Sequence, residues 1–176
     1  MQHSVVINFA YEVVGHHMED SDTKTIKIFA GKSTDGHAVY EELPVKKISQ
    51  DKYLLLSSPG IVLGLARGDE IIFEISSGKF RLTARGGNIC LQLYVTQHMT
   101  TEVDKLITLV EKNLNGTLDG KTNKQVVFTI PFASGFTSIE SLINCFIEAN
   151  PGTEWYYGNV YDETDGITPL NWWLDA

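Results

Sequence analysis

Cysteine and long apolar runs are scarce in this sequence. It contains two cysteines in 176 residues, Cys90 and Cys145, and their spacing matches neither a disulfide framework nor a zinc knuckle. We predict that both thiols are small buried side chains. No apolar run approaches the roughly 20 residues that a membrane-spanning helix needs, and the first residues form no basic leader. These absences favour a cytoplasmic protein without a membrane anchor.

Familiar catalytic and cofactor-binding motifs are also absent. The sequence has no P-loop, no dinucleotide-binding glycine fingerprint, no Gly-x-Ser-x-Gly elbow and no His-Glu-x-x-His helix. The glycines in Gly64–Asp69 lack the lysine of a phosphate loop, so we interpret this segment as a turn. The adjacent His16 and His17 would point to opposite faces of a strand, which disfavours joint chelation of a metal ion. We therefore expect a protein that is not an enzyme and has no cofactor or metal.

Positive charge is missing from the last quarter of the chain. The net charge is −8, from 14 Lys or Arg and 22 Asp or Glu, and residues 131–176 contain none of the former and seven of the latter. The same stretch contains all three tryptophans and three of the seven tyrosines. An acidic surface repels nucleic acid and anionic lipid but attracts a basic protein, and aromatic side chains provide area for anchoring at interfaces. This pattern favours a basic protein partner over nucleic acid or a membrane.

We predict a single α+β domain over residues 1–176. Its parts are a strand-rich region with antiparallel hairpins (residues 1–95), a region of strands and helices (residues 96–161) and an acidic, aromatic C-terminal extension (residues 162–176). The 43% hydrophobic and 20% charged residues are typical of a folded globule, and 15 glycines favour many turns. The strands expected in the first 60 residues are Ser4–Val14, Lys24–Phe29, Ala38–Ile48 and Lys52–Leu56.

A hairpin is predicted where the alternating runs Glu70–Ser76 and Lys79–Arg85 meet. Ser77-Gly78 would form a two-residue turn, and counting outward from it gives the register. The side chains expected on the buried face of the first run are Ile71, Phe73 and Ile75. The charged pairs expected across the hairpin are Glu74 with Arg81 and Glu70 with Arg85. These glutamates would neutralise a basic stripe that otherwise suggests nucleic-acid binding.

Two amphipathic helices are predicted in the second half. One begins near Thr101, where Asp104 approximates a capping box, and ends at Gly116. The other begins near Thr137, where Glu140 follows three residues later, and ends at Asn150-Pro151-Gly152. A strand, Ile89–Val95, precedes the first helix, and a polar loop and the strand Val126–Ile130 separate the two. Because each helix has one apolar face, we expect both to pack on a mixed sheet.

Several short motifs resemble those of a bacterial family defined only as a domain of unknown function. The matching residues are Glu41 or Glu42 with Leu43, Tyr53 and Leu55, Pro59, the Gly-Leu-x-x-Gly-Asp set Gly64, Leu65, Gly68 and Asp69, and the turn Gly87-Asn88. The likeness extends over residues 24–160. Two departures are Gly60, where the family usually has phenylalanine, and the missing basic end of the strand after Asn88. Since these are turn and core positions, the resemblance implies a shared fold rather than an activity.

In type, the chain is also similar to the small immunity proteins that accompany contact-dependent inhibition and polymorphic toxins. Such proteins bind and block a toxin domain in the cytoplasm, and many of these toxin domains are basic nucleases, which an acidic surface complements. We predict this function, by occlusion of the active site of the toxin. The candidate contacts are Glu154, Tyr157, Tyr161, Asp162, Glu163, Asp165, Trp172 and Trp173. The terminal tryptophan pair is either an exposed anchor or a lid on the core. The alternative is a domain that binds a small ligand or regulates without catalysis.

Overall fold

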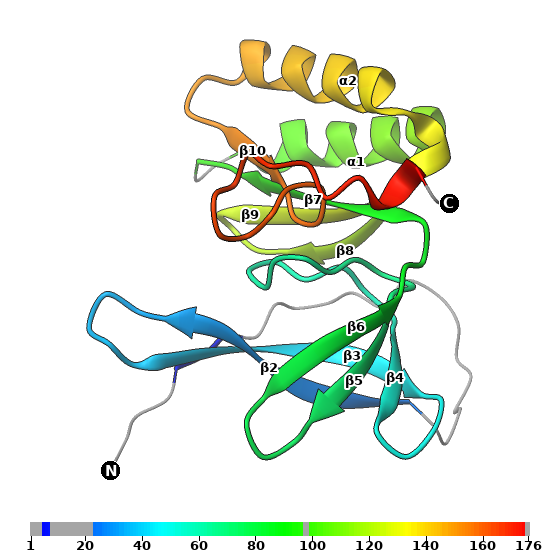
Figure 1. The fold of residues 1–176 in the computed structure, drawn as a ribbon. Helices are drawn as coiled ribbons and strands as arrows, with labels where there is room; N and C mark the ends of the chain where they lie inside the picture. Colours follow the sequence, from blue (N-terminus) through cyan, green and yellow to red (C-terminus); the bar gives the residue numbers. More distant parts are fainter. Residues whose placement is uncertain (1–4, 8–22, 97–98, 175–176) are drawn as a thin grey trace.

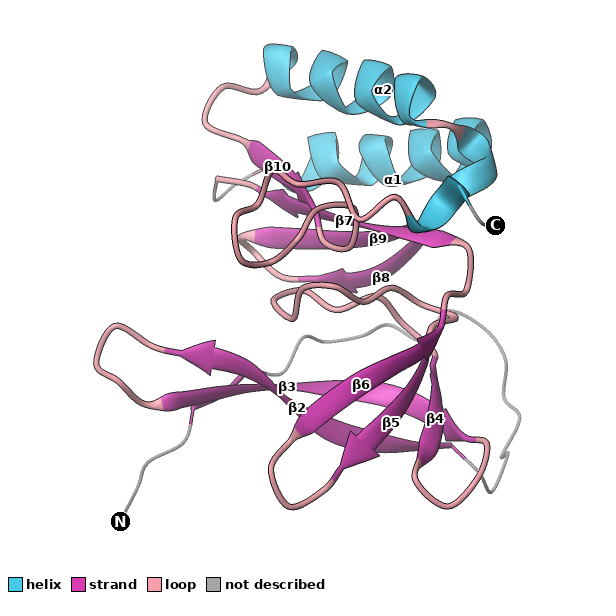
Figure 2. Ribbon diagram, in the orientation of Figure 1, coloured by secondary structure: helices cyan, strands magenta, loops and turns pink. Residues whose placement is uncertain are grey.

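The computed structural model describes residues 5–7, 23–96 and 99–174, which form two β-sheets and two helices stacked in layers (Figure 1). One sheet lies at the end of the molecule opposite the helices, and the second sheet lies between it and them (Figure 2). The predicted α+β class, with strands concentrated in the first half and both helices after it, is confirmed. His16 and His17 lie outside the described residues.

The first sheet is built around an antiparallel meander. Its strands are β1 (Val5–Ile7), β2 (Thr23–Lys32), β3 (Ala38–Lys47), β4 (Lys52–Leu55), β5 (Glu70–Glu74) and β6 (Lys79–Ala84). β1 pairs in parallel with β3, and the other neighbours are antiparallel. Alternate residues face inward because successive side chains of a strand point to opposite sides. The Phe29 amide donates to the Gly78 carbonyl at 2.9 Å, which joins β2 to the β5–β6 turn and curls the sheet over its core.

The β5–β6 hairpin forms, but the predicted register is wrong. Phe73 lies opposite Phe80 and Glu74 opposite Lys79, so the turn contains four residues instead of two. The Gly78 amide closes it on the Glu74 carbonyl at 2.9 Å. Ile71 and Phe73 are buried as predicted, whereas Ile75 lies in the turn and is 74% exposed. The longer turn is favoured because the Gly78 carbonyl also binds β2, a tertiary contact that local spacing does not encode.

The predicted charged pairs of this hairpin are therefore replaced by others. Glu70 forms an ion pair with Lys52 of the neighbouring strand β4. Arg85 instead binds the buried Asp69 carboxylate at 3.0 Å. Arg85 of the hairpin is thus neutralised by Asp69, the residue before β5, rather than by the facing Glu70.

The second sheet and the helices form a β-α-β-β-α-β unit. The elements are β7 (Asn88–Tyr94), α1 (Thr100–Leu114), β8 (Thr117–Lys121), β9 (Gln125–Pro131), α2 (Phe136–Ala149) and β10 (Glu154–Tyr157), with short 3₁₀ turns at Phe132–Ser134 and Trp172–Leu174. The sheet order is β10-β7-β9-β8, so the arrangement is ferredoxin-like.

Every neighbouring pair in this second sheet is antiparallel, and the parallel pair β1–β3 lies in the other sheet. The mixed sheet expected beneath the helices is thus antiparallel in the described residues. The reason is β8, which occupies part of the segment interpreted as a polar loop. After α1 crosses the sheet, β8 adds a strand, so that β9 returns antiparallel to both β7 and β8. The Asp-Gly pair in Thr117–Lys121 resembles a turn and here marks a register shift within the strand.

Both helices pack on this sheet through their predicted apolar faces. The fully buried helix residues are Val103, Leu106, Val110, Leu114, Ile139 and Ile143. The predicted capping boxes do not form, since Met99 and Gly135 occupy the N-cap positions without a side-chain hydrogen bond. Cys90 is buried as predicted, but Cys145 is exposed. Cys145 lies on the solvent side of α2. A residue that falls between core residues in the sequence of a helix can still point away from the core.

A connecting segment, residues 56–69, lies between the two sheets (Figure 1). We call it the seam segment. The Glu41 carboxylate of β3 accepts hydrogen bonds from the amides of Gly60, Ile61 and Val62 at 2.6–3.0 Å. On the opposite side, the Pro59 carbonyl accepts from the Gln92 side chain of β7 at 3.1 Å. These bonds explain how a loop can be buried, because unpaired backbone groups would be costly away from water.

Two buried aspartates anchor the rest of the seam segment. Asp69 accepts from the Ala66 and Gly86 amides at 3.0 and 2.8 Å and pairs with Arg85. Asp119 of β8 accepts from the Ser58 amide at 2.6 Å. Burial raises the pKa of both carboxyl groups above the usual aspartate value, and their hydrogen bonds and the nearby arginines oppose that rise. Asp119 therefore joins the seam segment to β8, and Asp69, which is one of the residues of the family resemblance, joins its end to the segment between β6 and β7.

Candidate binding groove

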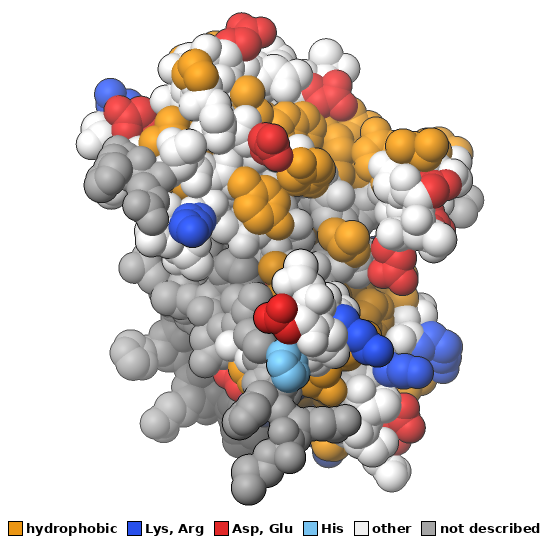
Figure 3. Space-filling view, turned by 90° about the vertical axis from the view of Figure 1, so that its left-hand side faces the viewer, with side chains coloured by type: hydrophobic (Ala, Val, Ile, Leu, Met, Phe, Trp, Pro, Cys, Tyr) orange, Lys and Arg blue, Asp and Glu red, His pale blue; other side chains and the backbone are white. Residues whose placement is uncertain are grey.

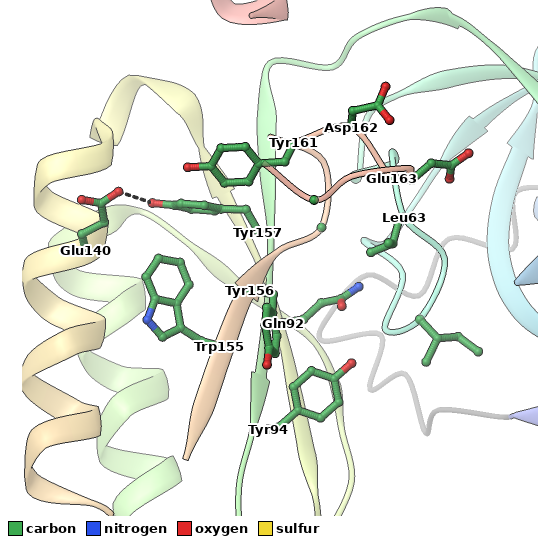
Figure 4. Close-up of a pocket in the computed structure, with 13 residues that line it drawn as sticks. Leu63, Gln92, Tyr94, Glu140, Trp155, Tyr156, Tyr157, Tyr161, Asp162 and Glu163 are labelled. Carbon is green, nitrogen blue, oxygen red and sulfur yellow. Dashed lines mark hydrogen bonds between the residues drawn. The ribbon is translucent and has the colours of Figure 1, made fainter. Parts of the chain in front are cut away.

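A groove of about 610 Å³ opens at the edge of the second sheet formed by β10 (Figure 4). Its walls come from β10, β7, α2, the seam segment and the loop that follows β10. The lining residues are Ile61, Leu63, Gln92, Tyr94, Glu140, Trp155, Tyr156, Tyr157, Gly158, Tyr161, Asp162, Glu163 and Gly166. Figure 3 shows hydrophobic side chains gathered over the upper part of one face of the molecule, with acidic side chains among them.

One side of the groove faces α2. The Trp155 indole N–H donates to the Asn144 side chain at 3.1 Å, and the Tyr157 hydroxyl donates to the Glu140 carboxylate at 3.4 Å (Figure 4). Burial raises the pKa of the Tyr157 phenol well above its ordinary value, and the negative charge of Glu140 raises it further. The hydroxyl therefore remains protonated and can donate to Glu140.

The other side of the groove faces the seam segment. Tyr156, which points away from the helices, is 52% exposed and donates its hydroxyl to Glu154 at 2.9 Å. Its ring meets that of Tyr94 edge to face, with centroids 5.9 Å apart. Leu63 contributes an exposed apolar side chain from the seam segment. Trp155 and Tyr156 project from opposite faces of β10, so the groove passes around the edge of the sheet.

The charge lining the groove is negative. Glu140, Asp162 and Glu163 line it, and none of the lining residues is a lysine or arginine. Asp162 accepts a hydrogen bond from the Thr164 amide at 2.8 Å. Glu163 makes no hydrogen bond or ion pair with any residue that the structure describes. At least one carboxylate is therefore available to a cationic group entering from solvent.

The structure brings together only part of the predicted contact set. Tyr157, Tyr161, Asp162 and Glu163 line the groove, and Glu154 lies beside it through its bond to Tyr156. Asp165 instead closes a turn, where its carboxylate accepts from the Ile167 and Thr168 amides at 2.9 and 2.8 Å. That any of these residues contacts a toxin stays a prediction.

The terminal tryptophans lie apart from the groove, against the body of the protein. Trp172 donates its indole N–H to the Asn159 carbonyl at 2.8 Å, and its ring meets Phe132 with centroids 5.8 Å apart. Trp173 packs on Phe136 at 5.1 Å. Both are half-buried next to the core of the second sheet. Their positions match the interpretation of a lid on the core and not that of an exposed anchor.

Most of the groove residues, Trp155 and Tyr156 of β10 among them, were not predicted as contacts, and three of them come from elements that precede β10 in the chain. Gln92 and Tyr94 belong to β7, and Glu140 was considered only as a capping residue of α2. A signal existed for the first two: they fall between the apolar positions of the strand, on its opposite face. Periodicity identifies that face. It does not show that β10 pairs beside it, which requires the tertiary fold.

No catalytic or metal centre is evident in the described part of the chain. It contains no group of three or more His, Cys, Asp or Glu side chains placed to hold a metal ion. The Cys90 thiol is fully buried, and burial raises its pKa well above the ordinary value, which makes it unreactive. Ser58 is also buried, and its hydroxyl shares a hydrogen bond with the Thr129 hydroxyl of β9 at 2.6 Å. Among the described residues, no helix is long and apolar enough to cross a bilayer.

Comparison with known families identifies the chain. A family model described as "Domain of unknown function (DUF4265)" matches residues 41–152. The chain belongs to the DUF4265 family. The matched range of this DUF4265 protein includes the seam segment and both helices, and it is narrower than the resemblance expected over residues 24–160. It ends before β10, so the groove combines residues inside the matched range, such as Tyr94, with residues beyond it, such as Tyr157. No curated protein matches the sequence.

A solved structure shares the fold. It is described as a novel crystal structure of a hypothetical protein from Neisseria gonorrhoeae, and it matches with a TM-score of 0.60 and 16% sequence identity. The match covers 82% of this chain and 96% of that one. At this identity the likeness shows the fold alone.

Proposed function

We propose that this DUF4265 protein binds a basic partner protein through the β10 groove and that the partner is a bacterial toxin domain which it neutralises by covering the active site. One observation carries the proposal. The groove combines exposed aromatic rings with carboxylates and has no basic side chain in its lining. Aromatic rings anchor interfaces and attract cations through their faces, and carboxylates steer a cationic partner toward them.

Charge also favours this class of partner over two others. The chain has a net charge of −8, and residues 131–176 contribute seven acidic residues and no basic ones. Phosphates of nucleic acid and the headgroups of anionic lipid would be repelled from this surface. A basic protein would be attracted at long range, and its association rate would fall as salt screens the charges.

The most direct test uses the polypeptide encoded next to the gene for this protein. We expect its expression alone to stop bacterial growth and co-expression of this chain to restore growth through a stable complex.

The variants Glu140→Lys and Glu163→Lys should slow association by about tenfold at low salt and weaken its salt dependence. Glu148→Lys is the matched control, because Glu148 is also an exposed acid of α2 but lies outside the groove lining. Equal rates for all three variants would rule out the groove as the docking surface.

The volume of the groove favours a second candidate, a small-ligand-binding domain. About 610 Å³ lies within the 300–1,000 Å³ that is usual for ligand sites. Native mass spectrometry of the protein purified from its own host separates the two candidates. A bound small molecule that Tyr156→Ala removes would support ligand binding, whereas a bound basic polypeptide supports the proposed inhibition.

A further inference from the structure

We propose that the partner enters the groove as an extended cationic segment that pairs with the outer edge of β10 and continues the second sheet. This inference rests on the proposed function and adds the mode of binding. Its starting point is the shape of the groove, which is lined by residues from both faces of one strand. Trp155 and Tyr157 lie on the helix side of β10, and Tyr156 lies on the opposite side (Figure 4). A single occupant that reaches both sides must run along the strand edge between them.

The backbone of β10 has free hydrogen-bonding groups along that edge. β10 pairs with β7 on one side and has no strand on the other among the described residues. The Gly158 amide donates to the Cys90 carbonyl at 2.8 Å, in line with the register of β10 and β7. Because hydrogen-bonded pairs alternate in an antiparallel ladder, Glu154 and Tyr156 bond toward β7, and the N–H and C=O groups of Trp155 and Tyr157 point outward. No described residue pairs with these outward groups.

An added strand would place its side chains alternately on the two sides of the groove. On the helix side they would meet Glu140 beside the Trp155 and Tyr157 rings. On the other side they would meet Glu154 and Tyr156. Arginine or lysine side chains suit both sides, since each combines a carboxylate with aromatic faces. Main-chain bonds would therefore supply pairing, and the flanking side chains would select positive charge.

Charge also decides against a second copy of this chain as the occupant. Edge-to-edge pairing of two β10 strands would bring the acidic grooves of both copies, with Glu140 and Glu154 of each, into one interface. Like charges near one another in an interface destabilise it. We therefore expect a monomer in solution by analytical ultracentrifugation. A dimer that Trp155→Glu dissociates and that buries the outward amides would overturn the proposal.

The direct test is NMR titration of the ¹⁵N-labelled full-length protein with a capped hexapeptide of alternating threonine and arginine. The amides of Trp155 and Tyr157 should shift and become protected from exchange, whereas those of Glu154 and Tyr156, already bonded to β7, should change little. Peptides methylated on the backbone nitrogens of either the threonines or the arginines keep the same charge. At least one of them should bind about tenfold more weakly, because it loses its two main-chain hydrogen bonds to the Trp155 and Tyr157 carbonyls.

A control peptide of alternating threonine and glutamate tests the preference for a cationic partner separately from strand pairing at β10. If it binds as well as the arginine peptide, charge selection is wrong and the proposed function fails with it. If only the arginine peptide binds, but both methylated forms bind equally well and the amides show no alternation, strand pairing is wrong while the cationic partner remains supported. Absence of any binding of the arginine peptide at millimolar concentration would count against both.

Discussion

Carboxylates serve opposite purposes in the seam and in the groove. In the seam, Glu41, Asp69 and Asp119 are buried, and each binds backbone amides of the chain itself. In the groove, Glu163 is exposed and makes no hydrogen bond or ion pair with the described residues, and Glu140 makes only a long contact with a phenol, at 3.4 Å. The same side-chain chemistry therefore stabilises the fold in one region and remains available to a partner in the other.

The difference has an energetic basis. A buried carboxylate loses its hydration, which is costly, so it persists only where several hydrogen-bond donors converge on it. The seam supplies those donors because the backbone of residues 56–69 lies between two sheets. The groove carboxylates retain solvent and bear little of this cost. Replacing seam acids should therefore affect stability, and replacing groove acids should affect association.

The largest expected effect is at Glu41. Glu41→Ala would leave the amides of Gly60, Ile61 and Val62 without their acceptor, at a cost of about 3–5 kcal/mol in the free energy of unfolding. Urea denaturation followed by circular dichroism measures this. Glu42→Ala, one residue along the same strand, removes a surface pair with Lys27 and should cost about 1 kcal/mol or less. Similar losses for the two variants would remove the distinction between seam and surface.

A smaller loss is expected at the C-terminal lid. Trp172→Ala removes the ring contact with Phe132 and the hydrogen bond to the Asn159 carbonyl, and we expect a loss of about 2 kcal/mol because the side chain is half-buried. Leu174→Ala, at a residue that is 73% exposed, is the control and should change stability by less than about 0.5 kcal/mol. Association with the basic partner should stay the same in both variants. If Trp172→Ala left stability intact but abolished binding, the tryptophan would be an anchor rather than a lid.

The seam should also have a distinct pH dependence. Burial raises the folded-state pKa of Asp119 above the ordinary aspartate value of 3.8, so the folded protein binds a proton more tightly than the unfolded chain does. Stability from this group is complete below pH 3.8 and declines as pH rises through the raised pKa. Subtracting the urea-derived unfolding free energy of Asp119→Asn from that of the wild type, at pH steps from about 3 to 7, should show this decline. If the difference in unfolding free energy between the wild type and Asp119→Asn grew with pH, the pKa of Asp119 would be lowered in the folded state instead of raised.

The smallest effect is expected in the groove. Glu163→Lys should change the free energy of unfolding by less than about 0.5 kcal/mol, since the side chain has no described partner and is exposed. The measurement is urea denaturation at neutral pH, beside Glu148→Lys as the control. Substantial destabilisation by Glu163→Lys alone would show that the groove acids also support the fold, and the contrast with the seam would weaken.

Sequence reasoning predicted the elements better than their partners. The helices around Val103–Leu114 and Ile139–Phe146 and most of the strands follow from apolar spacing, which is local. The register of the β5–β6 hairpin was wrong because Gly78 binds β2. β8 was missed because Asp119-Gly120 resembles a turn. The exposure of Cys145 could not be obtained from its neighbours, because burial on a helix depends on what packs against it.

For the candidate site too, local features were predicted and contacts between distant segments were not. Composition alone revealed that residues 131–176 combine aromatic rings with uncompensated acids, and that excess is a property of the chain in any conformation. Only the fold separated Trp172 and Trp173, which pack on the body, from Tyr157 and Tyr161, which line a groove. Only the fold brought Tyr94 and Glu140 to the same place. Charge and local periodicity are additive along a sequence, whereas a binding surface depends on which distant segments become neighbours, and that is decided when the whole core packs.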